Sequence, residues 1–205
     1  SLRRQRQMCI RDRYTGWDDP RLPTIRALRR RGFQPEAIKE FWLDFGLTEK
    51  DVSASMENLE AYNRRIVENG NRYFFVPQPV KITVRDIPPT RVAVKRHPSK
   101  PKRGVKRYEF DGTHEFYVPK KDLSGFFRPK EAFNVKKIKG TTYEDAGKEL
   151  VDCPKIQWVD VQSCLDVKVV MPDATELKGK GEKYIEETKV DEVVQFERFG
   201  FVRID

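Results

Sequence analysis

The side chains best suited to directed chemistry lie in the last stretch of the chain, residues 193–205. Apolar residues alternate there with Gln195, Glu197 and Arg198. The amide of Gln195 offers a donor and an acceptor, and the guanidinium of Arg198 offers forked donors and a flat stacking surface. We therefore expect polar recognition on this stretch, with an ion pair between Arg198 and Glu197 or another acid as the alternative for that residue.

The apolar residues of the same stretch predict the elements that carry these side chains. Val194 and Phe196 are followed, after a slip at Arg198–Phe199, by Phe201. This pattern predicts a strand, a bulge or tight bend, and a second strand. A chain that ends on its most strand-like segment is expected to complete a β-structure begun much earlier.

The distribution of charge points to an anionic partner. The net charge is +9, but residues 71–140 hold 18 basic and 6 acidic residues, whereas residues 141–205 hold 9 and 15. Basic side chains that contact phosphates release counterions and gain affinity, so the middle block predicts a polyanion. A solvated basic surface without a partner is the alternative, and it accounts poorly for an imbalance confined to one block.

Little in the sequence suggests catalysis or a metal. Asp18 and Asp19 have no histidine or further acid beside them, so an Asx-type turn is the simpler account. Three cysteines without a C-x-x-C pair and only two histidines disfavour a zinc site and suit a reduced, cytoplasmic protein. No Gly-rich loop joins a strand to a helix, and no apolar run is long enough to span a membrane.

Residues 14–70 are predicted to be mainly helical. Thr24 caps a helix to Arg31, and a second helix begins at Pro35 and is stopped by Gly46. A capping box at Thr48–Asp51 starts a third helix that ends near Glu68. Trp17 has the area to anchor the preceding loop on a neighbour. The second helix carries an apolar stripe that is expected to be core: Ile38, Phe41, Trp42 and Phe45.

From Arg72 the apolar pattern has a period of two. Short strands separated by proline-containing turns are predicted, with a hairpin over residues 105–118 that turns at Asp111-Gly112. This pattern favours antiparallel barrels over a parallel sheet, so the predicted class is α+β. Residues 1–13 hold five arginines without periodicity, and we expect a non-native tail or, as an alternative, a basic arm.

Short motifs in a fixed order resemble the class I glutamyl- and glutaminyl-tRNA synthetases over roughly residues 14–205. The motifs are GWDDPRLPT (16–24), LRRRG (28–32), NRYFFV (71–76), HPSKP (97–101), RPKEAF (128–133), IQWV (156–159) and VQFERFG (194–200). Gln157 before Trp158 and the ending at residues 199–205 are similar to the archaeal glutamyl enzyme. Glutaminyl enzymes are expected to have histidine before that tryptophan.

The resemblance implies a helical stem-contact region, residues 14–70, followed by two mainly antiparallel β-barrels, residues 71–205. The final strand, 193–205, is expected to return to the first barrel. Anticodon contacts are implied for Arg72, Gln195, Arg198, Arg128 and Lys130, and backbone or stem contacts are expected for Arg21, Arg29, Arg30, Lys100, Lys102 and Arg103. Splayed anticodon bases are recognised on their hydrogen-bonding edges, and the Gln195 amide suits uracil.

The implied partner is tRNA of the glutamate isoacceptors, with the glutamine isoacceptors as an open alternative, bound by a monomer in the cytoplasm. The HIGH signature, the Rossmann fold and the KMSKS-type loop are absent from this sequence. We therefore expect no catalytic residue, metal or cofactor here, with ATP and Mg²⁺ needed only by the full-length enzyme. The chain is expected to be a fragment, or a truncated product with foreign sequence at its start.

The segment 122–128 is shorter than in the family, which puts base discrimination on that side in question. Three alternatives remain open: the same region of a glutaminyl enzyme, a standalone RNA-binding barrel and a free-standing enzyme. The helical segment 24–68 argues against the standalone barrel. The lack of an acid/base pair or nucleophile–histidine pair argues against the free-standing enzyme.

Overall fold

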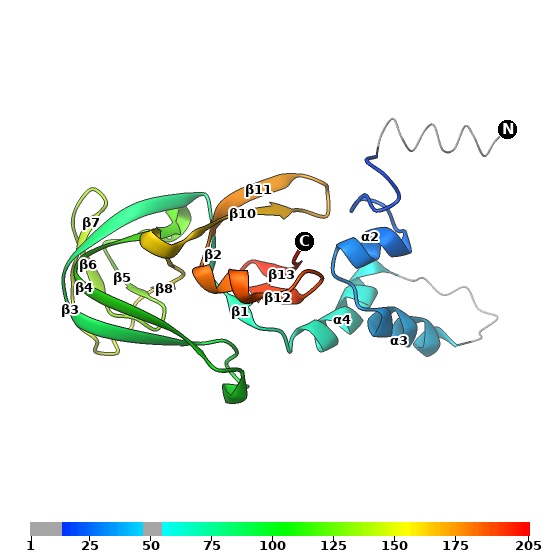
Figure 1. The fold of residues 1–205 in the computed structure, drawn as a ribbon, viewed down its shortest axis with the longest axis horizontal. Coiled ribbons are helices and arrows are strands. Elements are labelled where there is room, and N and C mark those ends of the chain that lie inside the picture. The colour runs from blue at the N-terminus through cyan, green and yellow to red at the C-terminus, as the bar shows by residue number, and fades with distance from the viewer. Residues whose placement is uncertain (1–13, 47–54) are drawn as a thin grey trace.

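The structure, a computed structural model, describes residues 14–46 and 55–205. Within these ranges three helices come first and the strands follow them, which confirms the predicted α+β class. The molecule is elongated, with the helices at one end, a large sheet at the other and two small sheets between them (Figure 1). None of the described helices is long and apolar enough to cross a membrane.

The start of α2 and the end of α3 lie at capping signals of the sequence. They are α2 (Ile25–Arg30), α3 (Pro35–Phe45) and α4 (Met56–Val67). The Thr24 hydroxyl accepts a hydrogen bond from the N–H of Ala27, and Gly46 ends α3 with a φ of 62°. Both predicted signals are confirmed. Ser55 caps α4, whereas the predicted box at Thr48–Asp51 lies outside the described residues.

The helices share a small core. Its members are Leu28, Phe33, Phe41 and Leu59, with Ile38 and Tyr62 partly buried. The prediction that Trp42 is core is wrong, because its side chain is 59% exposed. One step along a helix turns a side chain by about 100° from its neighbour, so Trp42 points away from the face on which Phe41 is buried. Trp17 is half exposed as well.

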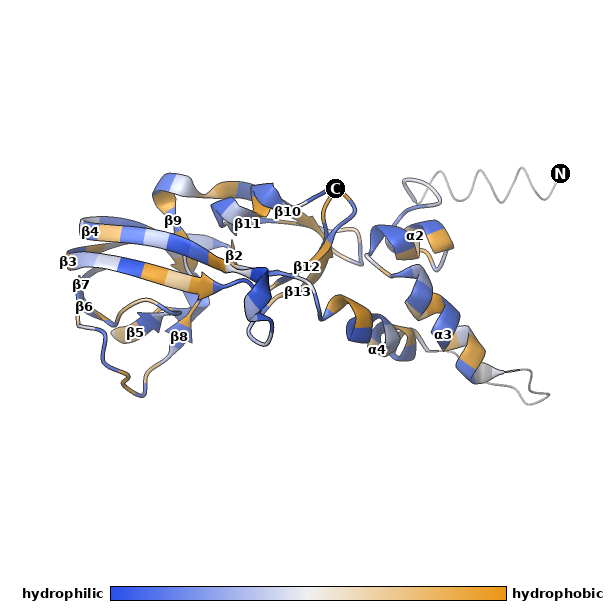
Figure 2. Ribbon diagram, turned by 60° about the horizontal axis from the view of Figure 1, so that its bottom comes forward, coloured by the Kyte–Doolittle hydropathy of each residue, from blue (hydrophilic) through white to orange (hydrophobic). Residues whose placement is uncertain are grey.

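Seven strands form the large sheet, in the order β8-β5-β6-β7-β3-β4-β9. They are β3 (Pro79–Lys95), β4 (Val105–Pro119), β5 (Phe126–Pro129), β6 (Val135–Lys139), β7 (Thr142–Asp145), β8 (Lys155–Ile156) and β9 (Val159–Asp160). Most neighbours are antiparallel, and β3–β7 and β5–β8 are parallel. Figure 2 shows apolar and polar residues alternating along β3 and β4, as a sheet with one buried face requires.

The predicted hairpin at Asp111-Gly112 is wrong. β4 is one strand that runs through both residues, antiparallel to β3 over most of its length. The register shifts on either side of Ile87, which pairs with Gly112, and Gly112 has a φ of 64°. The Asp-Gly pair therefore forms part of a bulge, because a long partner strand is available to bind the backbone on both sides of it. The turn that joins β3 to β4 is the basic segment 96–104.

Two three-stranded sheets lie between the helices and the large sheet. One has the order β1-β12-β13 and the other β10-β11-β2. Their strands are β1 (Arg72–Tyr73), β12 (Val193–Phe196), β13 (Gly200–Arg203), β10 (Leu165–Val170), β11 (Glu176–Gly181) and β2 (Phe75–Pro77). The 3-10 turns are η1 (Pro101–Arg103), η2 (Lys120–Asp122), η3 (Val161–Ser163) and η4 (Lys183–Glu187).

The segment 72–77 joins the β regions because its side chains enter two cores. Phe74 and Val76 belong to the core of the large sheet, while Tyr73 and Phe75 pack with the terminal strand. All four are at most 1% exposed. Successive residues of a strand point to opposite sides, so this short run ties the two cores together.

The last stretch of the chain is a strand, a tight turn and a second strand, as predicted. β12 pairs antiparallel with β13, and we call β12, the turn 197–199 and β13 the terminal hairpin. Phe199 N–H donates to the Phe196 carbonyl at 3.0 Å, and Arg198 has a φ of 57°. β12 also pairs in parallel with β1, so the end of the chain lies beside the first strand of the β region.

A largely buried pair fastens β9 to β4. One oxygen of Asp160 lies 2.8 Å from His114 Nε2, and the other accepts from the Ser163 hydroxyl at 2.6 Å. Burial alone would raise the pKa of Asp160. The hydrogen bonds from His114, Ser163 and the Gln162 N–H outweigh it, so the pKa falls below its usual 3.8.

This lowered pKa predicts a loss of stability in acid. The unfolded chain binds the Asp160 proton more tightly, so the stabilisation is present above the unfolded pKa and is lost as the pH falls through the folded one. In urea titrations the wild type is expected to be more stable than Asp160→Asn near pH 7. This gap should begin to narrow below about pH 4, the unfolded pKa of an aspartate, and should close as the pH falls through the lower folded pKa. A gap that persists unchanged in acid would contradict the assignment.

Candidate nucleic-acid interface

Arg72 and Gln195 lie side by side although they are far apart in the sequence. The parallel pairing of β1 with β12 makes them direct register partners. Arg72 Nε and Gln195 Oε1 are both buried, and neither has a hydrogen-bond partner within the part of the chain that the structure describes. An unpaired buried polar atom costs about 1–3 kcal/mol, so a donor and an acceptor left open together suit a ligand that supplies both partners. We call these two residues the reading pair.

Arg198 lies in the turn that follows β12. Its guanidinium donates to Asp122 at 3.1 Å, and 55% of its side chain is exposed. The ion pair considered from the sequence is thus present, with Asp122 of η2 as the partner instead of Glu197. An exposed ion pair of this kind contributes little, about 0–1 kcal/mol, so the guanidinium can exchange its carboxylate for another acceptor.

Lys130 contacts the same turn from the large sheet. Its ammonium forms an ion pair with Glu197 and lies 5.9 Å from the centre of the Phe74 ring. The side-chain amide of Gln157 donates to the Glu197 carbonyl, and Trp158 Nε1 donates to the Lys130 carbonyl at 2.9 Å. Lys130 and Gln157 therefore fix the backbone on which Arg198 is carried.

Arg128 is placed differently from the other residues expected at the anticodon. Its side chain donates to the carbonyls of Ala132 (2.8 Å), Lys148 and Glu149 and to the Asn134 amide oxygen (each 3.2 Å). The residue is only 9% exposed. These internal bonds brace two loops of the large sheet, and a contact between Arg128 and RNA stays a prediction.

The basic loop, residues 97–104, packs on the segment that joins α4 to β1. Lys100 donates to Asn69, and Arg103 donates to the Asn71 amide oxygen at 3.0 Å. Lys102 is exposed in the 3-10 turn of this loop. Asn71 directly precedes Arg72, so the loop brings its positive charges to the end of β1 that carries the reading pair.

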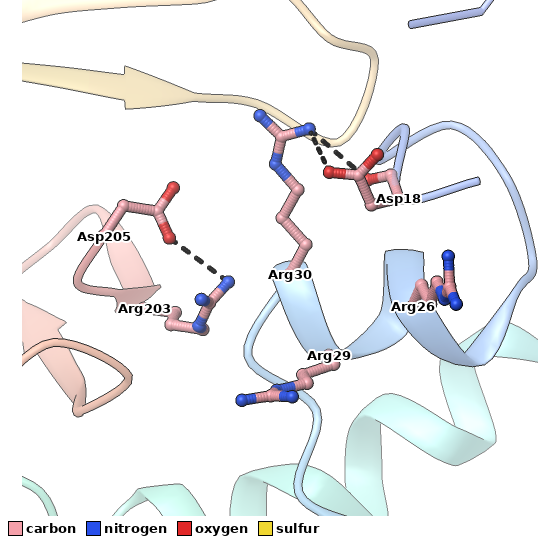
Figure 3. A pocket seen from close by; sticks show the side chains of 6 residues that line it. All are labelled: Asp18, Arg26, Arg29, Arg30, Arg203 and Asp205. Atoms are coloured by element: carbon pink, nitrogen blue, oxygen red, sulfur yellow. Dashed lines mark hydrogen bonds and ion pairs between the residues drawn. The ribbon is translucent and has the colours of Figure 1, made fainter. Parts of the chain in front are cut away.

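The remaining predicted basic residues gather near the helices. Arg29 and Arg30 of α2 and Arg203 of β13 line an open pocket of about 640 Å³ together with Arg26, Asp18 and Asp205 (Figure 3). Arg30 donates to Asp18 at 3.2 Å, and Arg29 donates to Asp191 at the same distance. Four guanidinium groups outnumber the two carboxylates around this hollow, so its lining is net positive although Arg29, Arg30 and Arg203 each pair with an aspartate. A net positive hollow favours an anion such as a phosphate.

Arg21 has its main partner in its own loop. It forms an ion pair with the fully buried Asp19 at 2.7 Å, and its guanidinium stacks 4.9 Å from the centre of the Tyr14 ring. Hydrogen bonds from Arg21 and Thr15 hold the pKa of Asp19 well below its usual value, although burial opposes them. Asp19 therefore organises this loop, which agrees with the Asx-type turn expected from the sequence.

Several residues that shape the site were missed by sequence reasoning. Asp122, Lys106 and Glu182 bind, respectively, the Arg198 guanidinium, the Arg72 carbonyl and the N–H of Phe74. The sequence carried no signal for them, because charged residues are common throughout this chain and their partners are distant in the sequence. Among the described residues, no three His, Cys, Asp or Glu side chains are grouped so that they could hold a metal ion.

These features define a class of protein. The chain combines a β-rich body, a basic surface and a pair of open polar groups, as domains that bind single-stranded nucleic acid do. Two family models, each described as the anticodon-binding domain of class I (E and Q) tRNA synthetases, match residues 70–150 and 155–205. The chain belongs to this family of glutamyl- and glutaminyl-tRNA synthetases, which confirms the resemblance.

A third family model, described as the catalytic domain of the same synthetases, matches residues 1–69. It includes residues 1–13, which we expected to lie outside the family. Curated relatives are glutamate–tRNA ligases of Pyrococcus horikoshii (44% identity over 94% of this chain), Methanothermobacter thermautotrophicus (41%, 98%) and Methanosarcina mazei (42%, 94%). The chain spans 36%, 37% and 35% of these relatives.

Proposed function

We propose that this chain is the part of a glutamate–tRNA ligase that binds the anticodon of its tRNA. The observation that carries the proposal is the reading pair, whose buried donor and acceptor lack partners among the described residues. Arg72 and Gln195 would hydrogen-bond the edge of one unstacked base, and Arg198 would hold a neighbouring nucleotide through its exposed guanidinium. The relatives at 41–44% identity are glutamate–tRNA ligases, which favours the glutamyl over the glutaminyl alternative.

The architecture supports the division expected from the sequence. The proposed anticodon-binding region, residues 71–205, contains two packed cores, one under the large sheet and one under the small sheets. These cores would correspond to the two barrels. The terminal hairpin packs in the core of the small sheets and pairs with β1, where the β region begins. The helices of residues 14–70 and the arginine pocket would contact the phosphates of the tRNA stem, along with Arg21 and the basic loop.

In the full-length enzyme, ATP and Mg²⁺ would attach glutamate to the tRNA. Among the described residues, no group of side chains is arranged to hold Mg²⁺. We propose that the chain acts as a monomer in the cytoplasm and that glutamate isoacceptors, with glutamine isoacceptors as a further candidate, are its partners. It is expected to show no glutamate-dependent ATP–pyrophosphate exchange by itself.

Binding to purified tRNA tests the proposal. In moderate salt, the chain is expected to bind glutamate tRNA at least about tenfold more tightly than an unrelated tRNA. Both tRNAs offer phosphate contacts, but only glutamate tRNA carries the anticodon bases that are recognised. A glutamine tRNA and a double-stranded RNA without a loop serve as further competitors. Equal affinity for all four RNAs would overturn anticodon recognition and favour a general RNA-binding protein.

Replacement of Arg198 by glycine is expected to separate binding from stability. Arg198 has a φ of 57°, a conformation that costs a residue with a side chain roughly 1–2 kcal/mol and glycine almost nothing. Loss of the ion pair with Asp122 costs at most about 1 kcal/mol. Arg198→Gly should therefore unfold at the wild-type urea concentration or higher while binding glutamate tRNA more weakly. A large loss of stability, or wild-type affinity, would contradict this assignment.

A further inference from the structure

The strand segment 71–74 pairs with a neighbouring strand along one edge only. Gln195 of β12 and Glu197 of the turn that follows donate their backbone N–H groups to the carbonyls of Asn71 and Tyr73, at 2.9 and 3.0 Å. β1 is the outermost strand of this sheet, with β12 on its inner side. The backbone groups of Arg72 and Phe74 alternate with those of Asn71 and Tyr73, so they face the outer edge and need other partners.

Backbone groups and ionic side chains share that outer edge. The Arg72 N–H donates to the Arg96 carbonyl at 2.7 Å, and the Phe74 carbonyl accepts from the Glu182 N–H at 3.2 Å. The Arg72 carbonyl and the Phe74 N–H are instead bound by ionic side chains. Lys106 Nζ donates to the Arg72 carbonyl at 3.0 Å, and the Phe74 N–H donates to Glu182 Oε1 at 2.9 Å. Lys106 and Glu182 also form an ion pair, and the Tyr108 hydroxyl donates to the second oxygen of Glu182. The Lys106 side chain is 0% exposed and that of Glu182 is 2% exposed. We call Lys106, Tyr108 and Glu182 the buried cluster.

Burial of the charged groups of the buried cluster costs free energy, and their hydrogen bonds satisfy two of the backbone groups at the strand edge. Burial lowers the pKa of Lys106, although the charge of Glu182 opposes the shift. Burial and the same carboxylate raise the pKa of Tyr108 far above its usual value. Apolar residues of similar volume are often at least as stabilising as a buried ion pair. What apolar residues cannot supply is a pair of directed bonds that fix one carbonyl and one N–H of the strand.

The carbonyl held by Lys106 is that of Arg72, whose side chain is half of the reading pair. We propose that Lys106, Tyr108 and Glu182 are positioning residues for anticodon recognition. They would touch no nucleotide and would hold the backbone of Arg72 where its guanidinium and the Gln195 amide meet the same base. This inference rests on the proposed function and deepens it, because it assigns part of the base specificity to residues that do not contact the base.

The experiment measures discrimination between bases. Affinities are determined for an RNA hairpin that carries the anticodon arm of glutamate tRNA and for hairpins with each anticodon base replaced in turn. The double variant Lys106→Met/Glu182→Gln removes both charges and leaves no buried ion uncompensated. The ratio is the affinity for the original hairpin divided by the affinity for a hairpin with one base replaced. In the double variant this ratio is expected to fall about tenfold at one base, while the affinity for the hairpin replaced at that base changes less than about twofold.

The matched control is an exposed pair of the same residue types. Lys81 and Glu115 lie 3.0 Å apart on β3 and β4, and about half of each side chain is exposed. Lys81→Met/Glu115→Gln makes the same change of charge and is expected to keep the wild-type ratio. A general effect of charge on RNA affinity would appear in both double variants and would leave both ratios unchanged.

Tyr108→Phe provides a second, milder variant. It keeps the ring and both charges and removes one bond to Glu182, so the protein is expected to fold and its ratio to fall about threefold. Thermal unfolding establishes which variants are folded. Wild-type discrimination in the folded variants would overturn the inference and leave the proposed function standing. A wild-type protein that does not discriminate would instead overturn the proposed function, before any variant is compared.

Discussion

Alanine at both Arg72 and Gln195 is expected to abolish selective binding of glutamate tRNA without unfolding the protein. Neither Arg72 Nε nor Gln195 Oε1 bonds to another group in the described ranges, so these two atoms leave no internal partner unsatisfied when removed. Each lost base contact costs about 1–3 kcal/mol, which corresponds to roughly tenfold to hundredfold in affinity. Gel shifts in moderate salt measure the affinity, and circular dichroism checks the fold.

The two single variants and the double variant form a cycle. If Arg72 and Gln195 bind one base together, the double variant should lose less than the sum of the single losses. Arg85→Ala is the control, because Arg85 is exposed on β3 within the same basic block. It should weaken glutamate and unrelated tRNA equally. Unchanged selectivity in the double variant would contradict the assignment of the reading pair.

Phe196→Ala is expected to cost about 3–5 kcal/mol of unfolding free energy. Phe196 is 2% exposed, and its ring stacks on Phe75 with the centres 5.0 Å apart. Small domains are stable by only about 5–15 kcal/mol, so this loss would leave the small sheets marginal at room temperature. Urea unfolding measures the loss, and Val190→Ala, at a residue that is 69% exposed, is the control.

Removal of residues 193–205 should have a larger effect. It takes away Val194 and Phe196 from the second core, as well as the backbone bonds that β12 makes to β1. We expect the shortened chain to lose both the cooperative unfolding of the small sheets and the binding of glutamate tRNA. A shortened chain that folded and bound normally would show that the terminal hairpin does not organise this region.

Local patterns predicted the elements whose stability comes from near neighbours. Thr24 begins α2 and Gly46 ends α3 because caps act within one turn of the helix. The alternation around Val194 and Phe196, with its slip at Arg198, likewise predicted the terminal hairpin. The prediction of a buried Trp42 is wrong because an apolar stripe on one helix does not show how many of its residues a neighbouring helix covers.

By itself the sequence determined the helix caps, the strand periodicity, the concentration of positive charge and the motifs that identify the family. Only the tertiary structure decided that Gln195 stands opposite Arg72, that Arg128 is turned into the large sheet, and that β4 runs straight through Asp111-Gly112. The physical reason is that periodicity and capping depend on residues a few positions apart. Register and burial depend on strands distant in the sequence, which compete for the same backbone hydrogen bonds.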